Sequence, residues 1–175
     1  MTKLVLMMAC LAGCAAGPEQ EKGMKLDLQT TTKKEKNQTL VTATLRNTGS
    51  EPVHILLEFM LSSTYGTLTD EGGKELQAHN AAASRGARMF GSIKTHPLKP
   101  GEEVQVGQFS ISPSAQHALT GDYSWDLTEV KSKTLTLVMI YEVTEEAAKI
   151  AKQHKAPDVA VGRWTSKPVV LEFRK

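Results

Sequence analysis

Apolar and polar residues alternate in several short stretches between Lys25 and the end of the chain. The clearest are TLVTATLRN (39–47), YSWDL (123–127) and TLTLVMIYEV (134–143), in which alternate side chains are apolar. An alternation of period two is typical of strands that bury one face against a core. Because Tyr123 and Trp125 share a face, they predict, together with Trp164, at least one large aromatic side chain between two sheets.

Further strands are expected where apolar residues lie between turn signals such as 47–50 and 70–73. The nearly continuous apolar run Val53–Met60 favours a central strand that is buried on both faces. Between Val104 and Ile111 the apolar positions change parity at Gly107, which predicts a β-bulge there. Shorter strands are predicted at residues 26–28, 65–69, 74–76, 162–166 and 169–173.

Three segments depart from this alternation. Residues 144–155, TEEAAKIAKQHK, predict the one helix, because Thr144 suits an N-cap, acidic residues follow it and Pro157 ends it. Residues 77–96 have no clear period, which predicts a long loop that holds one helical turn at most. Residues 97–102, PLKPGE, predict a tight turn.

Several passages resemble bacterial immunoglobulin-like domains. TLVTATLRNTGSEPVHI (39–55) resembles their second and third strands, where Asn-x-Gly-Ser turns the chain. LKPGEEVQVGQFSI (98–111) resembles their Pro-Gly-Glu turn into the next strand, and TGDYSWDL (120–127) and GRWTSKPVVLEF (162–173) resemble their closing strands. The resemblance implies an antiparallel immunoglobulin-like β-sandwich in which the helix is an insertion, although the cysteine pair of antibody domains is absent.

The first residues have the layout of a secretory signal. Lys3 supplies a positive charge, and the uncharged apolar run Leu4–Leu11 is too short for a permanent membrane span. Leu11-Ala12-Gly13-Cys14 resembles the lipobox of bacterial lipoproteins. The resemblance implies cleavage between Gly13 and Cys14, a diacylglycerol anchor on the Cys14 thiol and a further acyl chain such as palmitate. An ordinary signal peptide with an incidental cysteine is the alternative.

These boundaries divide the chain into a signal peptide (1–13), a lipidated tether (14–24) and one domain (25–175). The chain has 21 Lys and Arg against 19 Asp and Glu, and cleavage removes only Lys3 from this balance. A nearly neutral chain does not favour a nucleic-acid partner. Both cysteines, Cys10 and Cys14, precede residue 25, so the domain must depend on its core and not on disulfides.

The domain contains no nucleophile elbow, phosphate-binding loop or His-Glu-x-x-His motif. Its histidines are spread along the chain, and none stands at ligand spacing with another histidine or a carboxylate. We therefore expect hydrogen-bonded or solvated histidines, with no metal and no other cofactor. The sequence favours a protein that is not an enzyme, and a hydrolase with an unfamiliar site is a lower-ranked alternative.

Arg85, Arg88 and Phe90 are the candidate partner contacts, because guanidinium groups and aromatic rings are enriched at interfaces. The alternative is that Met89 and Phe90 fix the loop to the core. The sequence thus predicts a binding module of the cell envelope that is held to the membrane by lipid on Cys14 and contacts a protein or another envelope component. The predicted location is the outer membrane in a Gram-negative host and the outer face of the cell membrane otherwise. An inhibitor of extracellular proteases is the second hypothesis.

Overall fold

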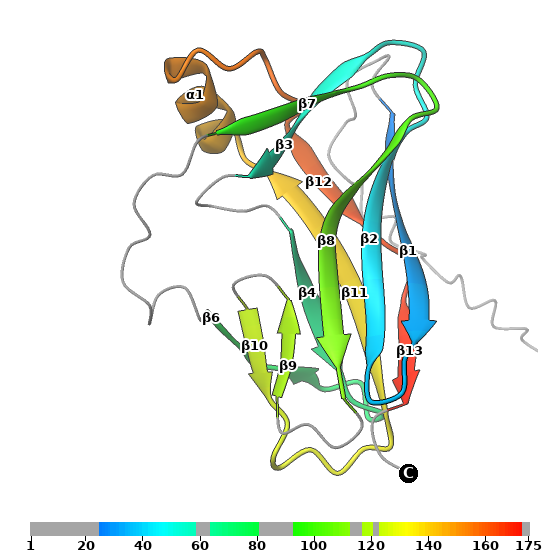
Figure 1. Cartoon of the computed structure of the whole chain (residues 1–175). Coiled ribbons are helices and arrows are strands. Elements are labelled where there is room, and N and C mark those ends of the chain that lie inside the picture. The colour runs from blue at the N-terminus through cyan, green and yellow to red at the C-terminus, as the bar shows by residue number, and fades with distance from the viewer. Residues whose placement is uncertain (1–24, 59–63, 81–92, 113–116, 121–122, 173–175) are drawn as a thin grey trace, which may run out of the picture.

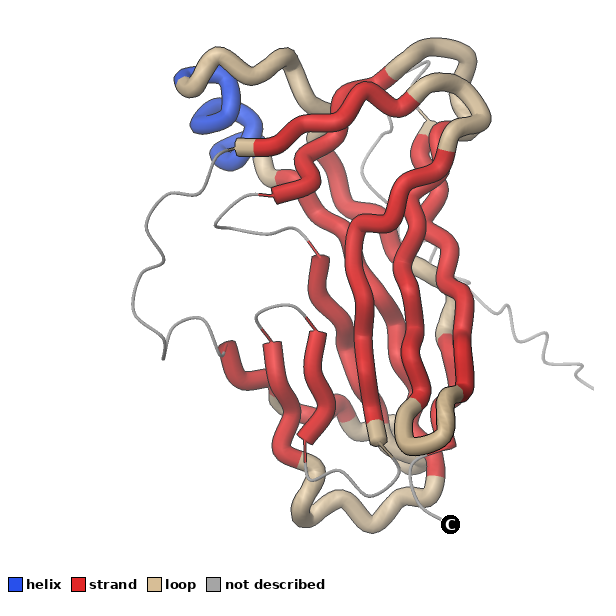
Figure 2. The backbone as a smooth tube through the Cα atoms, in the orientation of Figure 1, coloured by secondary structure: helices blue, strands red, loops and turns tan. Residues whose placement is uncertain are grey.

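The computed structural model describes residues 25–58, 64–80, 93–112, 117–120 and 123–172 of the chain. Its strands form two antiparallel sheets and a two-stranded ribbon, and Figure 1 shows the ribbon lying across one end of the two facing sheets. Figure 2 shows the helix of the described residues beside this ribbon. The arrangement confirms the predicted fold class, an all-β antiparallel sandwich of immunoglobulin-like type with one short helix.

The six-stranded sheet has the order β1-β2-β8-β9-β10-β6. Its strands are β1 (Leu26–Lys34), β2 (Thr39–Asn47), β6 (Ala78–Asn80), β8 (Glu103–Ile111), β9 (His117–Thr120) and β10 (Tyr123–Asp126). The five-stranded sheet has the order β12-β11-β4-β5, with β13 also paired to β11. Its strands are β4 (Thr64–Thr69), β5 (Glu75–Leu76), β11 (Thr134–Val143), β12 (Gly162–Thr165) and β13 (Val169–Glu172). The ribbon joins β3 (Val53–Glu58) to β7 (Lys94–Leu98).

The core is built from side chains at alternating positions of both sheets, as the sequence pattern predicts. Trp125 is only 1% exposed and packs edge-on against Phe109, with 5.8 Å between the ring centroids. The prediction of a large aromatic side chain between the sheets is therefore confirmed. Trp164 lies half-buried against Tyr141, with 5.5 Å between the centroids.

A bulge interrupts β8 at the predicted position. The register with β2 shifts between Ala43, which pairs with Gly107, and Thr44, which pairs with Gln105, so Val106 is the extra residue. Thr64 of the other sheet approaches here, and its hydroxyl donates to the Val106 carbonyl at 2.8 Å. A Cβ on Gly107 would overlap the methyl group of Thr64, which explains why glycine stands at this position.

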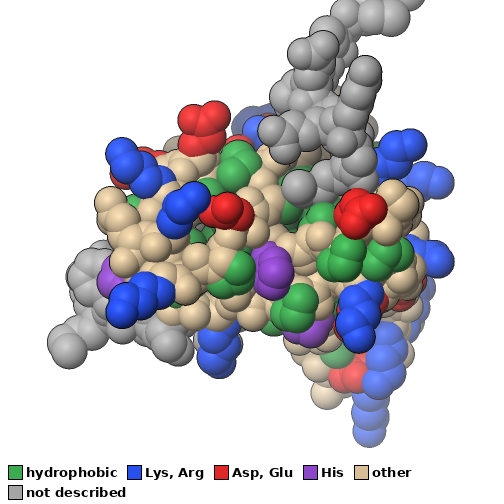
Figure 3. All heavy atoms as spheres, turned by 90° about the horizontal axis from the view of Figure 1, so that it is seen from above, with side chains coloured by type: hydrophobic (Ala, Val, Ile, Leu, Met, Phe, Trp, Pro, Cys, Tyr) green, Lys and Arg blue, Asp and Glu red, His purple; other side chains and the backbone are tan. Residues whose placement is uncertain are grey.

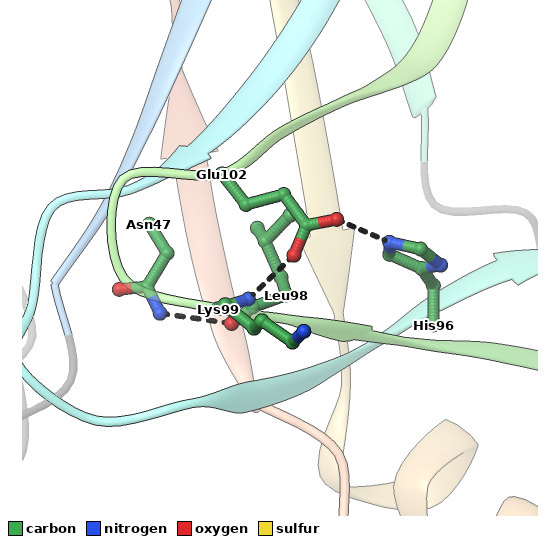
Figure 4. A network of polar contacts seen from close by, with 5 residues as sticks. All are labelled: Asn47, His96, Leu98, Lys99 and Glu102. Atoms are coloured by element: carbon green, nitrogen blue, oxygen red, sulfur yellow. Dashed lines mark hydrogen bonds and ion pairs between the residues drawn. The ribbon is translucent and has the colours of Figure 1, made fainter.

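The two turns predicted from Asn-x-Gly-Ser and Pro-Gly-Glu lie together at one end of the sandwich (Figure 4). Asn47 is fully buried, and its side-chain amide donates to the carbonyls of Leu98 at 2.9 Å and Glu51 at 2.8 Å. The Glu102 carboxylate accepts the backbone amide of Lys99 at 2.8 Å. These bonds satisfy backbone groups of both turns and fix the ribbon to the end of the six-stranded sheet.

β3, the described part of the apolar run 53–60, is not the central strand that the sequence predicts. β3 pairs with β7 in a sheet of two strands. Ile55 and Leu56 are nevertheless buried, because the ribbon lies over the open end of the core. The Tyr141 hydroxyl accepts the Leu56 amide at 3.1 Å and donates to the Leu56 carbonyl at 2.9 Å. Ile55 and Leu56 are therefore buried because the ribbon caps the core, and not because β3 lies in the middle of a sheet.

The predicted loop 77–96 is partly strand. β6 pairs with β10 and β7 pairs with β3, so both ends of the segment belong to the fold. Their pairing partners are distant in sequence, and short strands of this kind leave no local period to detect. Residues 81–92 lie outside the described residues. The predicted turn 97–102 is also shorter than expected, because Pro97 and Leu98 belong to β7.

Helix α1 (Glu145–Gln153) begins as predicted, since the Thr144 hydroxyl accepts the Ala147 amide at 3.2 Å. It ends before residue 155, the predicted end. Lys155 has a φ of 62°, which is incompatible with a continuing right-handed helix.

Candidate functional site

One face of the five-stranded sheet points away from the core. In β11 the residues Leu135, Leu137 and Met139 belong to the core, so the residues between them lie on the outer face. The register places Thr69 of β4 and Val170 of β13 on either side of Thr136. The antiparallel pairing thus builds one surface from β4, β11, β12 and β13.

Eight outward residues of this sheet share two properties: each is β-branched and none is charged. We call them the β-branched face: Thr67, Thr69, Thr134, Thr136, Val138, Ile140, Thr165 and Val170. Val170 is 68% exposed, whereas Ile140 is 2% exposed without belonging to the core cluster. β-Branched side chains have few rotamers, so this surface is stiff as well as uncharged.

Charged side chains stand at the two ends of the β-branched face. Glu142 and Arg163 are cross-strand partners at one end. Glu172 lies opposite Thr134, and Glu75 lies opposite Thr69, at the other end. The face therefore has polar ends and an uncharged middle, an organisation that many protein interfaces share.

A cluster of two tyrosines, an arginine and a glutamate closes the Glu142 end of the face; we call it the tyrosine–arginine cluster (Tyr65, Tyr123, Glu142 and Arg163). The Tyr65 hydroxyl donates to a Glu142 carboxylate oxygen at 2.7 Å. The Arg163 guanidinium carbon lies 5.9 Å from the centroid of the Tyr65 ring, within the range of a cation–π contact. The Tyr123 ring lies 5.8 Å from the Tyr65 ring, so β10 of the six-stranded sheet also contributes to this cluster.

The environment of Tyr65 determines its protonation. Burial, followed by the hydrogen bond to the Glu142 carboxylate, raises the pKa of the Tyr65 hydroxyl to about 12. The hydroxyl is therefore protonated at physiological pH and serves as a hydrogen-bond donor. The protonated hydroxyl is neither a nucleophile nor a base at neutral pH.

In the described part of the chain, no group of three or more His, Cys, Asp and Glu side chains could hold a metal ion. No helix within these ranges is long and apolar enough to cross a membrane.

The sequence-predicted site residues fall outside the described residues. This holds for Gly13 and Cys14 at the cleavage site and for the contact candidates Arg85, Arg88 and Phe90. The chain that carries these three contact candidates follows directly after Asn80, whose backbone pairs with Tyr123 of the tyrosine–arginine cluster. Asn80, the last described residue before the predicted contact segment, therefore lies beside the cluster.

Sequence reasoning missed both the β-branched face and the tyrosine–arginine cluster. A signal for the face was present in TLTLVMIYEV (134–143), where the outward positions are uncharged as far as Ile140. The pattern is easily overlooked when only the core-facing positions of the strand are considered. Outward positions of an exposed sheet are expected to be charged or strongly polar, so their uncharged character is the signal. The cluster could not be found in this way, because it joins residues from four strands.

Comparison with known proteins gives a fold-level likeness only. No protein-family model matches the chain, and no curated protein matches it. A Bordetella pertussis structure provisionally assigned as the ApaA protein is similar over 87% of this chain and 96% of its own, with 15% identity and a TM-score of 0.42.

Two other solved structures show weaker likeness. The Northeast Structural Genomics Consortium target SoR45 is 16% identical over 86% of each chain, with a TM-score of 0.36. β-Glucosidase 3B from Thermotoga neapolitana, solved with α-D-glucose, matches 85% of this chain but only 17% of its own, with 9% identity and a TM-score of 0.32. Likenesses at this level carry no argument about activity or partners.

Proposed function

We propose that this chain is a non-catalytic lipoprotein of the bacterial cell envelope whose domain binds a protein or another envelope component. The observation that carries the proposal is the β-branched face with the tyrosine–arginine cluster at its end. This surface is uncharged in the middle and includes the most exposed of the large apolar side chains described, Val170. A surface with these properties is suited to being covered.

Three physical features favour binding at this face. Covering it removes no charge from water, so it avoids the largest desolvation penalty, that of an unpaired charge. Its β-branched side chains have little rotamer freedom to lose. The nearby Arg163 and Tyr123 belong to residue types that often dominate interface energetics. The three features together give a contact that needs little rearrangement to form.

The anchor and the location remain part of the proposal on sequence grounds. The lipobox-like Leu11–Cys14 supports lipidation at Cys14, with an outer-membrane location in a Gram-negative host and the outer face of the cell membrane otherwise. Cys14→Ser should then abolish incorporation of a clickable fatty acid in cells. Equal labelling of the variant and the wild type would contradict the anchor alone, without bearing on the binding face.

Site-specific photo-crosslinking in cells tests the binding face. Thr136 and Thr42 are a matched pair, since both are half-buried threonines on the outer face of a central strand, one in each sheet. A photoreactive phenylalanine derivative at position 136 of the full chain should give a discrete adduct, and the same group at position 42 should not. Equal adducts from both positions, or an adduct from position 42 alone, would overturn the assignment of the face.

The predicted contacts Arg85, Arg88 and Phe90 extend the same proposal, because their segment follows Asn80 beside Tyr123. Changing all three to alanine should weaken the adduct at position 136 while the melting temperature stays within a few degrees. If the adduct is unchanged, these residues take no part in binding. If the captured partner is an extracellular protease that loses activity when bound, inhibition becomes the specific form of the function.

A further inference from the structure

The chain enters the fold at one end of the sandwich. The Lys25 carbonyl accepts the backbone amide of Thr48 at 2.8 Å, so the first described residue lies against the β2–β3 turn. The Gly101 amide of the β7–β8 turn donates to the Asn47 carbonyl at 2.8 Å, which places that turn at the same end. We call this end, with the β3–β7 ribbon that covers it, the tether end.

The surface of the tether end is rich in proline and other apolar residues. His54 of β3 pairs with Pro97 of β7, and the His54 carbonyl accepts the Ala160 amide at 2.8 Å. This brings Val161, which is 46% exposed, to the ribbon, where Pro52 and Pro97 are also exposed. Figure 3, seen from above, shows apolar and histidine side chains across the middle of this end, with acidic side chains among them and lysines and arginines around them.

The opposite end of the sandwich has a different composition. Its turns carry exposed charged residues, namely Glu35 and Lys36, Glu71 and Lys74, and Glu129 and Lys131. These side chains are strongly hydrated and would resist a low-dielectric surface. The tether end also exposes charged residues, among them Lys25, Glu51 and Lys99, but in addition it exposes the apolar Pro52, Pro97 and Val161.

Chain length determines which end stays near the anchor. The ten residues between Cys14 and Lys25 reach at most about 35 Å when fully extended, and a flexible chain of that length typically spans about 17 Å. β11 alone, with ten residues, is about 33 Å long. Holding the charged end at the bilayer would therefore require an almost fully stretched tether, whereas the tether end reaches the bilayer without stretching.

We propose that the tether end is a membrane-facing surface that rests on the phospholipid bilayer holding the Cys14 lipid. Pro52, Pro97 and Val161 contact the boundary between headgroups and acyl chains, and the Lys25 and Lys99 ammonium groups lie near lipid phosphates. The contact is weak by itself, but the anchor makes it intramolecular and so raises its effective concentration. The β-branched face then stands to the side of the membrane, open to a partner. This inference rests on the proposed lipid anchor.

Fluorescence quenching on the lipidated full chain tests the orientation. Three single-cysteine variants carry the same environment-sensitive dye: Val161→Cys at the tether end, Val170→Cys on the side and Lys131→Cys at the far end. The chain is placed in vesicles of phosphatidylcholine and phosphatidylglycerol with brominated acyl chains. We expect a blue shift and strong quenching at 161, little quenching at 170, and none above the aqueous background at 131.

Failure of the orientation and failure of the anchor give different results. Mass spectrometry of the N-terminal peptide reports acylation of Cys14, and an acylated cysteine cannot take the dye. If Cys14 is acylated but the three positions are quenched equally, or position 131 is quenched most, the membrane-facing surface is wrong and the anchor stands. If Cys14 is unmodified, the anchor is wrong and this inference fails with it.

Discussion

The outer faces of the two sheets have the same backbone geometry but different chemistry. On the six-stranded sheet, Asp27, Arg46 and Glu103 form one cross-strand row, and the Arg46–Glu103 pair is separated by 3.6 Å. On the five-stranded sheet, the charged outward residues Glu142, Arg163 and Glu172 stand at the ends of the β-branched face. The middle of the six-stranded sheet's outer face adds the amides of Gln29 and Gln108 to its threonines, whereas the middle of the β-branched face has only β-branched side chains. An exposed ion pair of the first kind contributes little to stability but is costly to desolvate. The comparison shows that the two outer faces differ in the middle, where one carries amides and an ion-paired row lies near its end, and the other carries only β-branched side chains.

The largest expected effect is a loss of stability of the core that supports both sheets. Trp125→Ala leaves a cavity beside Phe109 and should lower the free energy of unfolding by about 3–5 kcal/mol. Urea denaturation followed by circular dichroism measures this loss. Trp125→Phe is the control with a smaller cavity, and it should cost less. If Trp125→Ala unfolds at the wild-type urea concentration, the core is not organised around this ring.

The next effect concerns the point where the two sheets meet. Gly107→Ala introduces a methyl group against Thr64 and should cost about 1–3 kcal/mol, as other overpacked sites do. Adding Thr64→Ser removes the opposing methyl group but keeps the hydroxyl that bonds to Val106, so it should recover part of the loss. Urea denaturation of both single variants and the double variant completes a double-mutant cycle, in which Thr64→Ser alone is the control. If the two changes in unfolding free energy simply add, the close approach of Gly107 and Thr64 is contradicted.

A smaller effect is expected at the end of the β-branched face. Tyr65→Phe removes the hydrogen bond to Glu142 and should cost about 1 kcal/mol at neutral pH. Glu142→Gln keeps an acceptor for the Tyr65 hydroxyl and serves as the control with a smaller loss. A Tyr65→Phe variant as stable as the wild type would show that the bond makes no net contribution.

The same tyrosine predicts a pH dependence with a definite sign. The pKa of Tyr65 is raised from 10.0 to about 12, so its contribution to stability is complete below pH 10 and is lost as the pH rises from 10 to 12. The Tyr65→Phe variant should lose less stability in this window than the wild type. The variant should still lose some stability as the pH rises, because burial also raises the pKa of Tyr141. Identical pH profiles for variant and wild type would contradict the raised pKa.

The sequence predicts well what depends on local pattern. Alternation locates β2, β10 and β11, the parity change locates the bulge at Gly107, and Thr144 marks the helix start. The sequence does not predict structure that depends on pairing between distant segments. The segment 53–58 becomes a capping ribbon, because its backbone groups bond to β7 and to the Tyr141 hydroxyl and not to a strand of either large sheet. The tyrosine–arginine cluster likewise depends on a register that no single segment encodes.

A matched pair of charge insertions tests the central claim, that the β-branched face is the binding surface. Val170 is 68% exposed and Leu119 is 51% exposed, and they lie on the outer faces of the five-stranded and six-stranded sheets. Lysine at either site should leave the melting temperature nearly unchanged, because both side chains are mainly in water.

The measurement is affinity for the partner captured through position 136. Val170→Lys should weaken binding by about tenfold or more, because it places an uncompensated charge in the covered area. Leu119→Lys should bind as the wild type does. Unchanged binding by Val170→Lys, or an equal loss in both variants, would contradict the account.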